Sequence, residues 1–367
     1  MRTHCPANER IKREYLTYLK EAQRYSEPSL DGIAKAIARF ETYTRHTDFK
    51  KFQVQQAVGF KNKLASATNA TSGKPLSLAT QRSTLNALKA FFKWLAAQPG
   101  YKSRFTYADA DYFNLSEKDN RVAQTNTPRP FPSLEQVQHV IRSMPATTVI
   151  EQRNRALVTF TLITGCRDRA MVSLKLKHVD LAKALVNLDA REVETKFSKS
   201  FVTYFMPVGD DIRAIFDEWI VTLIKDHLWG PADPLFPATL IGIDNEGSFR
   251  AIGLKREHWT TATAVRRIFR EAFEASGLPY FHPHSLRHTL GQLGQKLCRT
   301  PEEFKAWSQN YGHDHVMTTF MSYGNVATDR QGEIIRQLGT PGIPAQRDLA
   351  ELLQQAAIAL KSTPPRG

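Results

Sequence analysis

The sequence predicts a mainly α-helical protein of two domains, with one small antiparallel β-sheet in the second domain. Its 367 residues correspond to two or three domains at roughly 150 residues each. Hydrophobic residues make up 41% and charged residues 23%, which is the balance of a globular chain with a buried core. Apolar residues recur at helical spacing in the first hundred residues, whereas short β-type segments occur only between residues 184 and 207.

Four helices are expected in the first domain. Apolar residues recur at helical spacing from 11 to 22 and from 33 to 40, the second run following the candidate N-cap Ser29. A third, short helix covers residues 54–64. The fourth is the clearest, because Ser77 can cap the long apolar run that follows it.

A proline-rich linker is expected between the two domains. Pro128, Pro130 and Pro132 force extended backbone and prevent a helix from continuing. A new helix is then expected after Ser133, because Ser133 and Gln136 have the spacing of a capping box. The predicted boundaries are 1–108 for the first domain, 109–130 for the linker, 131–332 for the second domain and 333–367 for a C-terminal tail.

The second domain is expected to be helical around a small sheet. An apolar helix at 155–164 ends at Gly165, and further helices follow at 211–226 and 261–275. The segments with strand-like composition are residues 184–188, 192–196 and 201–207. These elements complete the predicted fold class.

The C-terminal tail is expected to carry an amphipathic helix beyond a segment rich in glycine and proline at 339–344. Its apolar stripe consists of Leu349, Leu352, Leu353, Ala356 and Leu360. Such a stripe packs either on its own domain or on a neighbouring subunit.

The charge distribution points to a polyanionic partner. Fifty Lys and Arg against 36 Asp and Glu give a net charge of +14, and residues 49–107 contain ten bases and no acid. This pattern is typical of a nucleic-acid-binding domain, although a solvated basic surface or a membrane-surface contact shows it too. The candidate DNA-binding residues are Lys61, Lys63, Arg82, Lys89 and Lys93, the last three of which lie along one face of the fourth helix.

Several other classes of protein are disfavoured. No apolar run approaches the roughly 18 residues of a membrane span, and the polar N-terminus lacks a signal-peptide core. Three widely spaced cysteines favour reduced thiols and a cytoplasmic location. The histidine spacings match no zinc pattern, and neither a P-loop nor a GxGxxG motif is present, so we expect no metal and no cofactor.

Three polar segments of the second domain, at 164–170, 282–289 and 311–323, together resemble the catalytic boxes of tyrosine recombinases, the phage integrase family. The first box is an apolar helix that ends in Thr164-Gly-Cys-Arg167, and the second is His284-Ser-Leu-Arg287. The closing box contains Gly312-His313 and, ten residues later, Tyr323, and Lys196 resembles the family's strand-turn lysine. The resemblance extends over residues 10–330 and includes a helical core-binding domain before the catalytic domain.

The resemblance implies a site-specific recombinase that acts on double-stranded DNA without ATP or a metal. Arg167 and Arg287 would neutralise the phosphate, because two forked guanidiniums can offset the charge of the transition state. His284 and His313 would donate to the phosphoryl oxygens or manage the proton of the nucleophile Tyr323. The implied intermediate is a covalent 3′-phosphotyrosine with a free 5′-hydroxyl. The resemblance also implies a homotetramer on DNA, joined through the C-terminal helix.

Some assignments stay open at this point. Lys199 competes with Lys196 as the general acid, and Tyr311 and Tyr204 compete with Tyr323 as the nucleophile. Ala170 stands where the family usually has an acidic residue, and Asp168 or Asp180 is the candidate substitute.

Two other functions compete with recombination. A type IB topoisomerase would share the chemistry, although the HxxR box, the Gly-His box and the small helical first domain favour a recombinase. A catalytically silent DNA-binding protein is the other alternative, favoured only by the missing acid.

Overall fold

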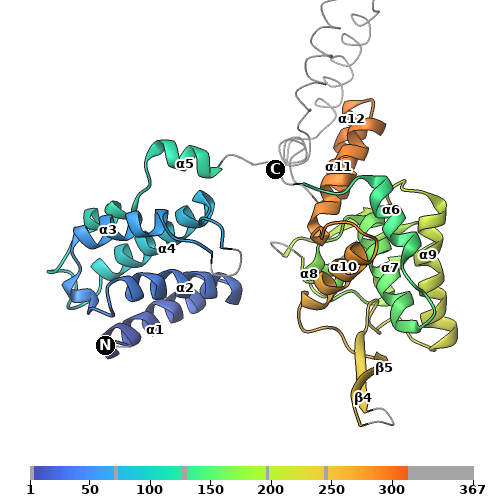
Figure 1. The fold of residues 1–367 in the computed structure, drawn as a ribbon, viewed down its shortest axis with the longest axis horizontal. Coiled ribbons are helices and arrows are strands. Elements are labelled where there is room, and N and C mark those ends of the chain that lie inside the picture. The colour runs from blue at the N-terminus through green and yellow to red at the C-terminus, as the bar shows by residue number, and fades with distance from the viewer. Residues whose placement is uncertain (1–3, 70–72, 125–129, 196–197, 244–246, 313–367) are drawn as a thin grey trace, which may run out of the picture. The chain divides into compact units, whose positions relative to one another are not determined.

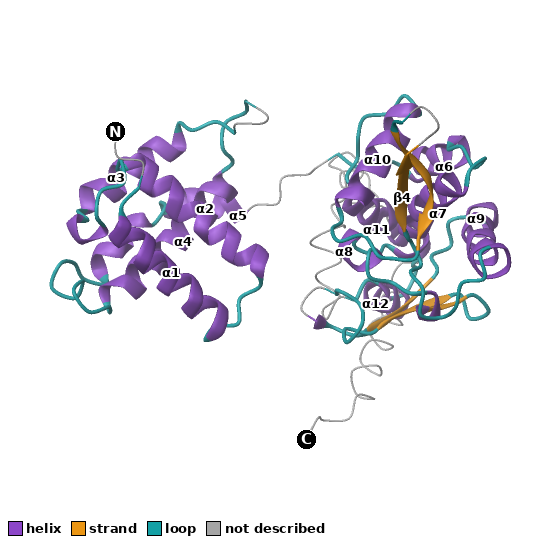
Figure 2. Ribbon diagram, turned by 90° about the horizontal axis from the view of Figure 1, so that it is seen from below, coloured by secondary structure: helices purple, strands orange, loops and turns teal. Residues whose placement is uncertain are grey.

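The computed structural model describes residues 4–69, 73–124, 130–195, 198–243 and 247–312. The chain divides into two compact units, Met1–Thr127 and Pro128–Gly367. Both units are mainly helical in their described parts, and antiparallel strands occur only in the second (Figures 1 and 2). The predicted fold class is therefore confirmed.

The first unit contains the four predicted helices. They are α1 (Pro6–Glu21), α2 (Glu27–Tyr43), α3 (Val54–Ala65) and α4 (Leu78–Ala96), with a short 3₁₀ turn, η1 (Phe49–Lys51), between the second and third. Ser77 caps α4 as predicted, since its hydroxyl accepts the amide of Thr80. The predicted cap Ser29 is wrong, because α2 begins at Glu27 after Ser26.

An aromatic cluster forms the core of this unit. The ring of Phe40 on α2 makes edge-to-face contacts with Phe60, Phe92 and Phe113, at centroid distances of 5.3, 5.4 and 5.5 Å. Phe113 belongs to a second 3₁₀ turn, η2 (Ala108–Phe113), which lies against α3 and α4. The helix α5 (Glu117–Gln124) follows and also packs on α4.

The predicted linker is consequently wrong over its first part. Residues 109–124 fold onto the first unit because Ala110 and Phe113 are buried in its core. A 3₁₀ turn with single apolar anchors produces no helical periodicity, which explains the error. Residues 125–129 lie outside the described part of the chain.

The second unit is built around α7 (Val149–Thr164). Every residue of α7 from Ala156 to Thr164 is buried. The helices in contact with it are α6 (Leu134–Ser143), α9 (Asp210–Val221), α10 (Thr263–Ala275) and α11 (Leu286–Leu297). The capping box predicted before α6 is present, because Ser133 and Gln136 exchange side-chain and backbone hydrogen bonds.

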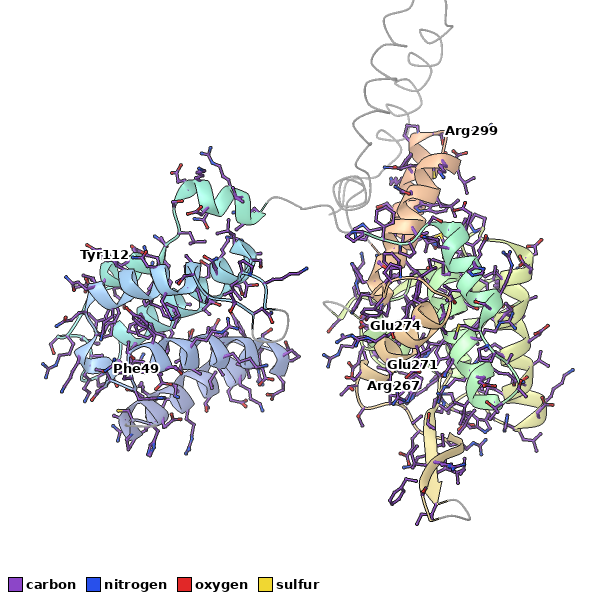
Figure 3. The ribbon with its side chains drawn as sticks, in the orientation of Figure 1. Phe49, Tyr112, Arg267, Glu271, Glu274 and Arg299 are labelled. Carbon is purple, nitrogen blue, oxygen red and sulfur yellow. The ribbon has the colours of Figure 1, made fainter. Side chains whose placement is uncertain are left out.

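Five further helical elements occur in the described part of this unit, four of which have five residues or fewer. They are α8 (Asp168–Met171), η3 (Leu176–His178), the π-helical turn η5 (Thr222–Asp226), the 3₁₀ turn η6 (Pro283–Ser285) and α12 (Pro301–Asn310). The helix α10 is amphipathic. Phe269 and Phe273 are buried in the core, and Figure 3 shows the charged Arg267, Glu271 and Glu274 along the same helix.

Two antiparallel sheets occur in the described part of the second unit. The first has the order β1 (Val179–Asp180), β2 (Leu185–Leu188), β3 (Phe201–Tyr204), with Val186 paired to Thr203. The predicted strands at 184–188 and 201–207 correspond to β2 and β3. The strand predicted at 192–196 is wrong in its described part, because residues 192 and 193 turn back and donate their amides to the carbonyl of Asp189.

The second sheet is a hairpin that the sequence did not predict. Its strands are β4 (Ala238–Ile243) and β5 (Phe249–Lys255), and it projects from the body of the second unit (Figure 1). Most of its side chains are exposed, so it lacks the alternation that marks a half-buried strand. None of the helices in the described ranges is long and apolar enough to cross a membrane.

Candidate active site

The site begins at the C-terminal end of α7. Gly165 ends this helix in a left-handed conformation with a φ of 61°. The hydroxyl of Thr164 donates to the carbonyl of Phe160 at 2.6 Å and accepts the amide of Cys166 at 3.1 Å. This closed turn places Arg167 at the N-cap of α8.

Arg287 lies in the first turn of α11 and is only 2% exposed. Its Nη1 donates to the carbonyl of Gly165 at 2.6 Å, and its Nη2 donates to the carbonyl of Tyr311 at 3.1 Å. The guanidinium carbon also lies 4.5 Å from the centroid of the Tyr311 ring. Two carbonyls and an aromatic face compensate for the burial of this charge and hold the guanidinium in one orientation.

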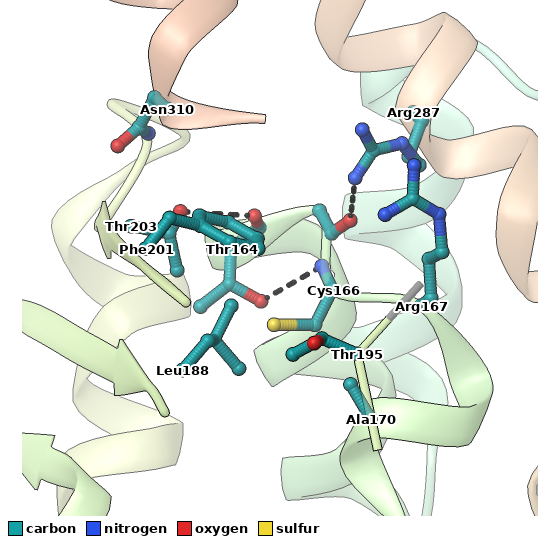
Figure 4. Close-up of a pocket in the computed structure, with 11 residues that line it drawn as sticks. Thr164, Cys166, Arg167, Ala170, Leu188, Thr195, Phe201, Thr203, Arg287 and Asn310 are labelled. Carbon is teal, nitrogen blue, oxygen red and sulfur yellow. Dashed lines mark hydrogen bonds between the residues drawn. The ribbon is translucent and has the colours of Figure 1, made fainter. Parts of the chain in front are cut away.

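Arg167 and Arg287 line the same pocket, which is drawn in Figure 4. They come from positions 120 residues apart and were both predicted as phosphate-binding groups. Thr195, Thr203 and Asn310 also line it, together with apolar side chains such as Leu188 and Phe201. Two positive charges with forked donors beside one pocket are suited to bind a phosphodiester.

His284 lies close to both arginines. The pKa of His284 is lowered to about 4, because the surrounding protein atoms desolvate the imidazole and the charges of Arg287 and Arg167 oppose a further proton. The residue nevertheless keeps more than a third of its surface accessible, so a substrate can reach it. A neutral imidazole at neutral pH offers one donor and one acceptor.

The other predicted catalytic groups, Lys196, His313 and Tyr323, lie outside the described residues. Their chain neighbours can be placed. The Nζ of Lys199 donates to the carbonyl of Gly312 at 3.2 Å, so this lysine contacts the residue before His313. Gly312 has a φ of 70°, and a Cβ there would lie 2.8 Å from the ring of Phe201.

Tyr311 and Tyr204, the two tyrosines that compete with Tyr323 as the nucleophile, lie in different surroundings. Tyr311 is fully buried, and its hydroxyl donates to the carbonyl of Arg287 at 3.3 Å. Tyr204 is 56% exposed on β3, where its backbone pairs with the side chain of Asn310. Sequence reasoning missed the structural role of Tyr311, although its place directly before Gly312 was a usable signal.

Ala170 is 5% exposed and lines the pocket with a methyl group where the family resemblance leads one to expect a carboxylate. The proposed substitutes have other partners. Asp168 accepts a hydrogen bond from Arg266 Nε at 2.8 Å, and Asp180 accepts the amide of Lys183 at 2.9 Å within a turn. Within the described ranges, no three His, Cys, Asp or Glu side chains are grouped so that they could hold a metal ion.

The predicted DNA-binding bases of the first unit partly gather around η2. Lys61 and Lys89 donate to the carbonyl and the side chain of Asn114, at 3.1 and 2.8 Å. Lys89 and Lys93 both pair with Asp111, at 2.9 and 3.3 Å, and they lower the pKa of its carboxyl group. Residues 49–107 contain no acid, so the carboxylate that pairs with Lys89 and Lys93 comes from Asp111 in the segment that follows.

The two remaining bases have different surroundings. Lys63 is exposed near the end of α3, and Arg82 is half-buried on α4.

Comparison with known proteins gives consistent matches. The model of the phage integrase family matches residues 133–330. The tyrosine recombinase XerC of Bacillus pumilus is 24% identical over 323 residues, which cover 88% of this chain and 93% of that protein. XerC of Escherichia coli O157:H7 is 23% identical over 308 residues, covering 83% and 88%.

Solved structures with the same fold include three DNA complexes. A lambda integrase dimer (residues 75–356) bound to a COC′ core site has a TM-score of 0.59 at 14% identity, covering 86% of this chain and 95% of that one. XerH bound to a palindromic difH substrate in a post-cleavage complex has a TM-score of 0.55 at 18% identity, covering 88% and 83%. The Tn1549 transposon integrase with transposon right end DNA has a TM-score of 0.54 at 14% identity, covering 90% and 99%.

Proposed function

The chain belongs to the phage integrase family, and we propose on this premise how its residues perform the reaction of a site-specific tyrosine recombinase. It is an enzyme that breaks and rejoins DNA strands. The observation that carries the proposal is the shared pocket of Arg167 and Arg287, with His284 close enough to respond to both charges.

The arginines would bind the scissile phosphate. Attack on a phosphodiester adds negative charge to the phosphoryl oxygens, and fixed guanidiniums stabilise that charge without reorganising. Arg287 is already held by two carbonyls and a ring, so it brings a preorganised donor set to the phosphate. His284, neutral at physiological pH, would add a hydrogen bond to the same oxygens or accept a proton from the nucleophile.

Tyr323 would be the nucleophile in this scheme. Its phenolic oxygen forms a bond to phosphorus, and its proton passes to a neighbouring base, for which His313 and His284 are the candidates. The bond to the 5′-oxygen breaks, and that oxygen takes a proton from Lys196, or from Lys199 in the alternative assignment. The product is a 3′-phosphotyrosine, which a 5′-hydroxyl of another strand attacks in the reverse step. The two guanidiniums supply the needed positive charge, so the scheme requires no metal or nucleotide.

The substrate is double-stranded DNA, in agreement with the DNA complexes among the structural neighbours. We assign the phosphate contacts of the first unit to Lys61, Lys63, Arg82, Lys89 and Lys93. Lys89 and Lys93 would exchange Asp111 for phosphate, a change that costs little because the carboxylate of Asp111 is solvent-exposed. We place the reaction in the cytoplasm, where such a substrate would be met.

The assembly we propose is a homotetramer on DNA, joined through the C-terminal helix within 333–367, which lies outside the described residues. Its support is the apolar stripe beyond the glycine- and proline-rich segment. Deleting the residues after Gly339 should weaken assembly on paired sites more than single-strand cleavage. Unchanged assembly of the deletion variant would contradict this assignment.

Trapping on suicide duplexes that carry candidate attachment sites tests the reaction. The wild type should form a denaturation-resistant protein–DNA adduct, and Tyr323→Phe should form none while binding DNA normally. Tyr311→Phe is the matched control, because it removes the same hydroxyl from the neighbouring candidate. Relaxation of a supercoiled plasmid without paired sites would favour the topoisomerase alternative. Binding without any adduct would favour a silent DNA-binding protein.

A further inference from the structure

Asp168 joins the chain segments that carry the proposed catalytic residues. It is the first residue of α8 and directly follows Arg167. Its side chain is only 16% exposed, and its Oδ2 accepts the Nε–H of Arg266 on α10 at 2.8 Å. The same oxygen lies 3.9 Å from Nε2 of His282, two residues before His284. One carboxylate therefore faces both the Arg167 segment and the His284 segment.

His282 continues this connection to the backbone of His284. Its Nδ1 accepts the amide of His284 at 3.2 Å, and its carbonyl accepts the amide of Ser285 at 2.8 Å. An amide can only donate, so Nδ1 carries no proton and the neutral ring has its proton on Nε2, toward Asp168. Burial lowers the pKa of His282, which favours this neutral form. The path from α8 to the turn η6 therefore consists of the approach of Asp168 to His282 at 3.9 Å, which is longer than a hydrogen bond, and of the hydrogen bond from the His284 amide to His282.

The acid at position 168 matters because position 170, where the family usually has an acidic residue, is occupied by alanine. Ala170 faces the pocket with a methyl group. The carboxylate two residues earlier instead pairs with Arg266, on a helix that does not carry any of the proposed catalytic groups. Without Asp168, Arg266 would lose its carboxylate partner, and α8 would lose its charged contact with α10.

We propose that Asp168 and Arg266 form a positioning pair that sets the placement of Arg167 relative to His284 and Arg287. Neither residue contacts the reacting atoms in this proposal; both act on the segments that present those groups. The inference rests on the proposed function, because it concerns the alignment of those residues on the phosphate. An error of about 1 Å in such an alignment can lower a rate by roughly a hundredfold.

A second ion pair in the same unit provides a matched control. Asp233 and Arg256 are also joined at 2.8 Å, with side-chain exposures of 23% and 54%, against 16% and 51% for Asp168 and Arg266. Each aspartate also accepts one backbone amide, from Gly230 for Asp233 and from Arg169 for Asp168. Asp168→Asn and Asp233→Asn thus remove equivalent charges, and only the first affects the proposed catalytic segments.

The first measurement is the first-order rate of adduct formation on a suicide duplex at saturating protein. Asp168→Asn should lower this rate by between about 10- and 100-fold, with the DNA dissociation constant changed less than about threefold, and Asp233→Asn should cleave like the wild type. Arg266→Gln should match Asp168→Asn, and the double variant should be no slower than the slower single variant. A wild-type rate for Asp168→Asn, an equal loss in Asp233→Asn, or additive losses in the double variant would overturn the proposal.

A second measurement does not depend on cleavage. Amide hydrogen exchange of residues 282–288 should be faster in Asp168→Asn than in the wild type and unchanged in Asp233→Asn, because the anchored amides belong to His284 and Ser285. Equal exchange in both variants would refute the contact. A wild type that forms no adduct, combined with faster exchange in Asp168→Asn, would reject the proposed function while supporting the link between the segments.

Discussion

Replacing Gly165 by alanine should destabilise the second unit by about 2–5 kcal/mol. A φ of 61° costs an L-residue about 1–2 kcal/mol. The new Cβ would also lie 3.0 Å from Cε1 of Tyr311 and 3.4 Å from Cδ1 of Leu290, two side chains that are fully buried. Crowding of this kind in a packed core costs about 1–3 kcal/mol more.

The variant Gly277→Ala separates the cost of the positive φ from the cost of crowding. It has a φ of 71°, and nothing lies within 4 Å of the position a Cβ would take. Gly277→Ala should therefore cost only the backbone part, about 1–2 kcal/mol. Guanidinium unfolding followed by tryptophan fluorescence suits the comparison, because Trp219, Trp229, Trp259 and Trp307 report on the second unit and only Trp94 lies in the first.

Gly165→Ala and Gly277→Ala also distinguish a loss of folding stability from a loss of cleavage activity. The carbonyl of Gly165 is the acceptor for Arg287 Nη1, so a shift of this residue moves the guanidinium. Adduct formation at a temperature where both variants are folded should fall in Gly165→Ala and stay near the wild-type rate in Gly277→Ala. Equal unfolding free energies for the two variants would refute the crowding argument.

Three further outcomes are expected. Arg287→Lys should lower the cleavage rate by about 10²–10³-fold with little change in DNA affinity, because one ammonium cannot replace the forked donors; a loss below about tenfold would contradict this. Tyr311→Phe should keep the adduct and lose about 1 kcal/mol of stability, since the hydrogen bond from its hydroxyl to the Arg287 carbonyl is removed while the ring stays; loss of the adduct in a variant that unfolding shows to be folded would make Tyr311 the nucleophile. The DNA-free protein should show His284 neutral by NMR down to about pH 5, since its pKa is lowered to about 4. The unfolded chain takes up this proton near pH 6.5 and the folded chain does not, so folding stability should fall from pH 6.5 toward pH 4; an NMR pKa above 6.5 would contradict the assignment.

Local signals in the sequence determined most of the helical framework. The capping positions Ser77 and Ser133 and the apolar run that became α7 were readable because each helix specifies its own start, period and end within a few residues. The order of the boxes also predicted Arg167, His284 and Arg287; the two arginines line one pocket, and their charges lower the pKa of His284. The catalytic roles of these three residues, like those of Lys196, His313 and Tyr323, stay predictions.

Only the tertiary structure decided which distant groups meet. Arg287 is held by the carbonyl of Gly165 across 122 positions, and Phe113 is buried against α2 although its own segment looked like linker. Lys89 pairs with Asp111, which lies beyond the segment that contains only bases, and Asp168 pairs with Arg266, which lies 98 positions away in the sequence. Helical period and capping are local properties of the chain, whereas these contacts depend on the packing of whole helices, and no short segment contains the information that sets them.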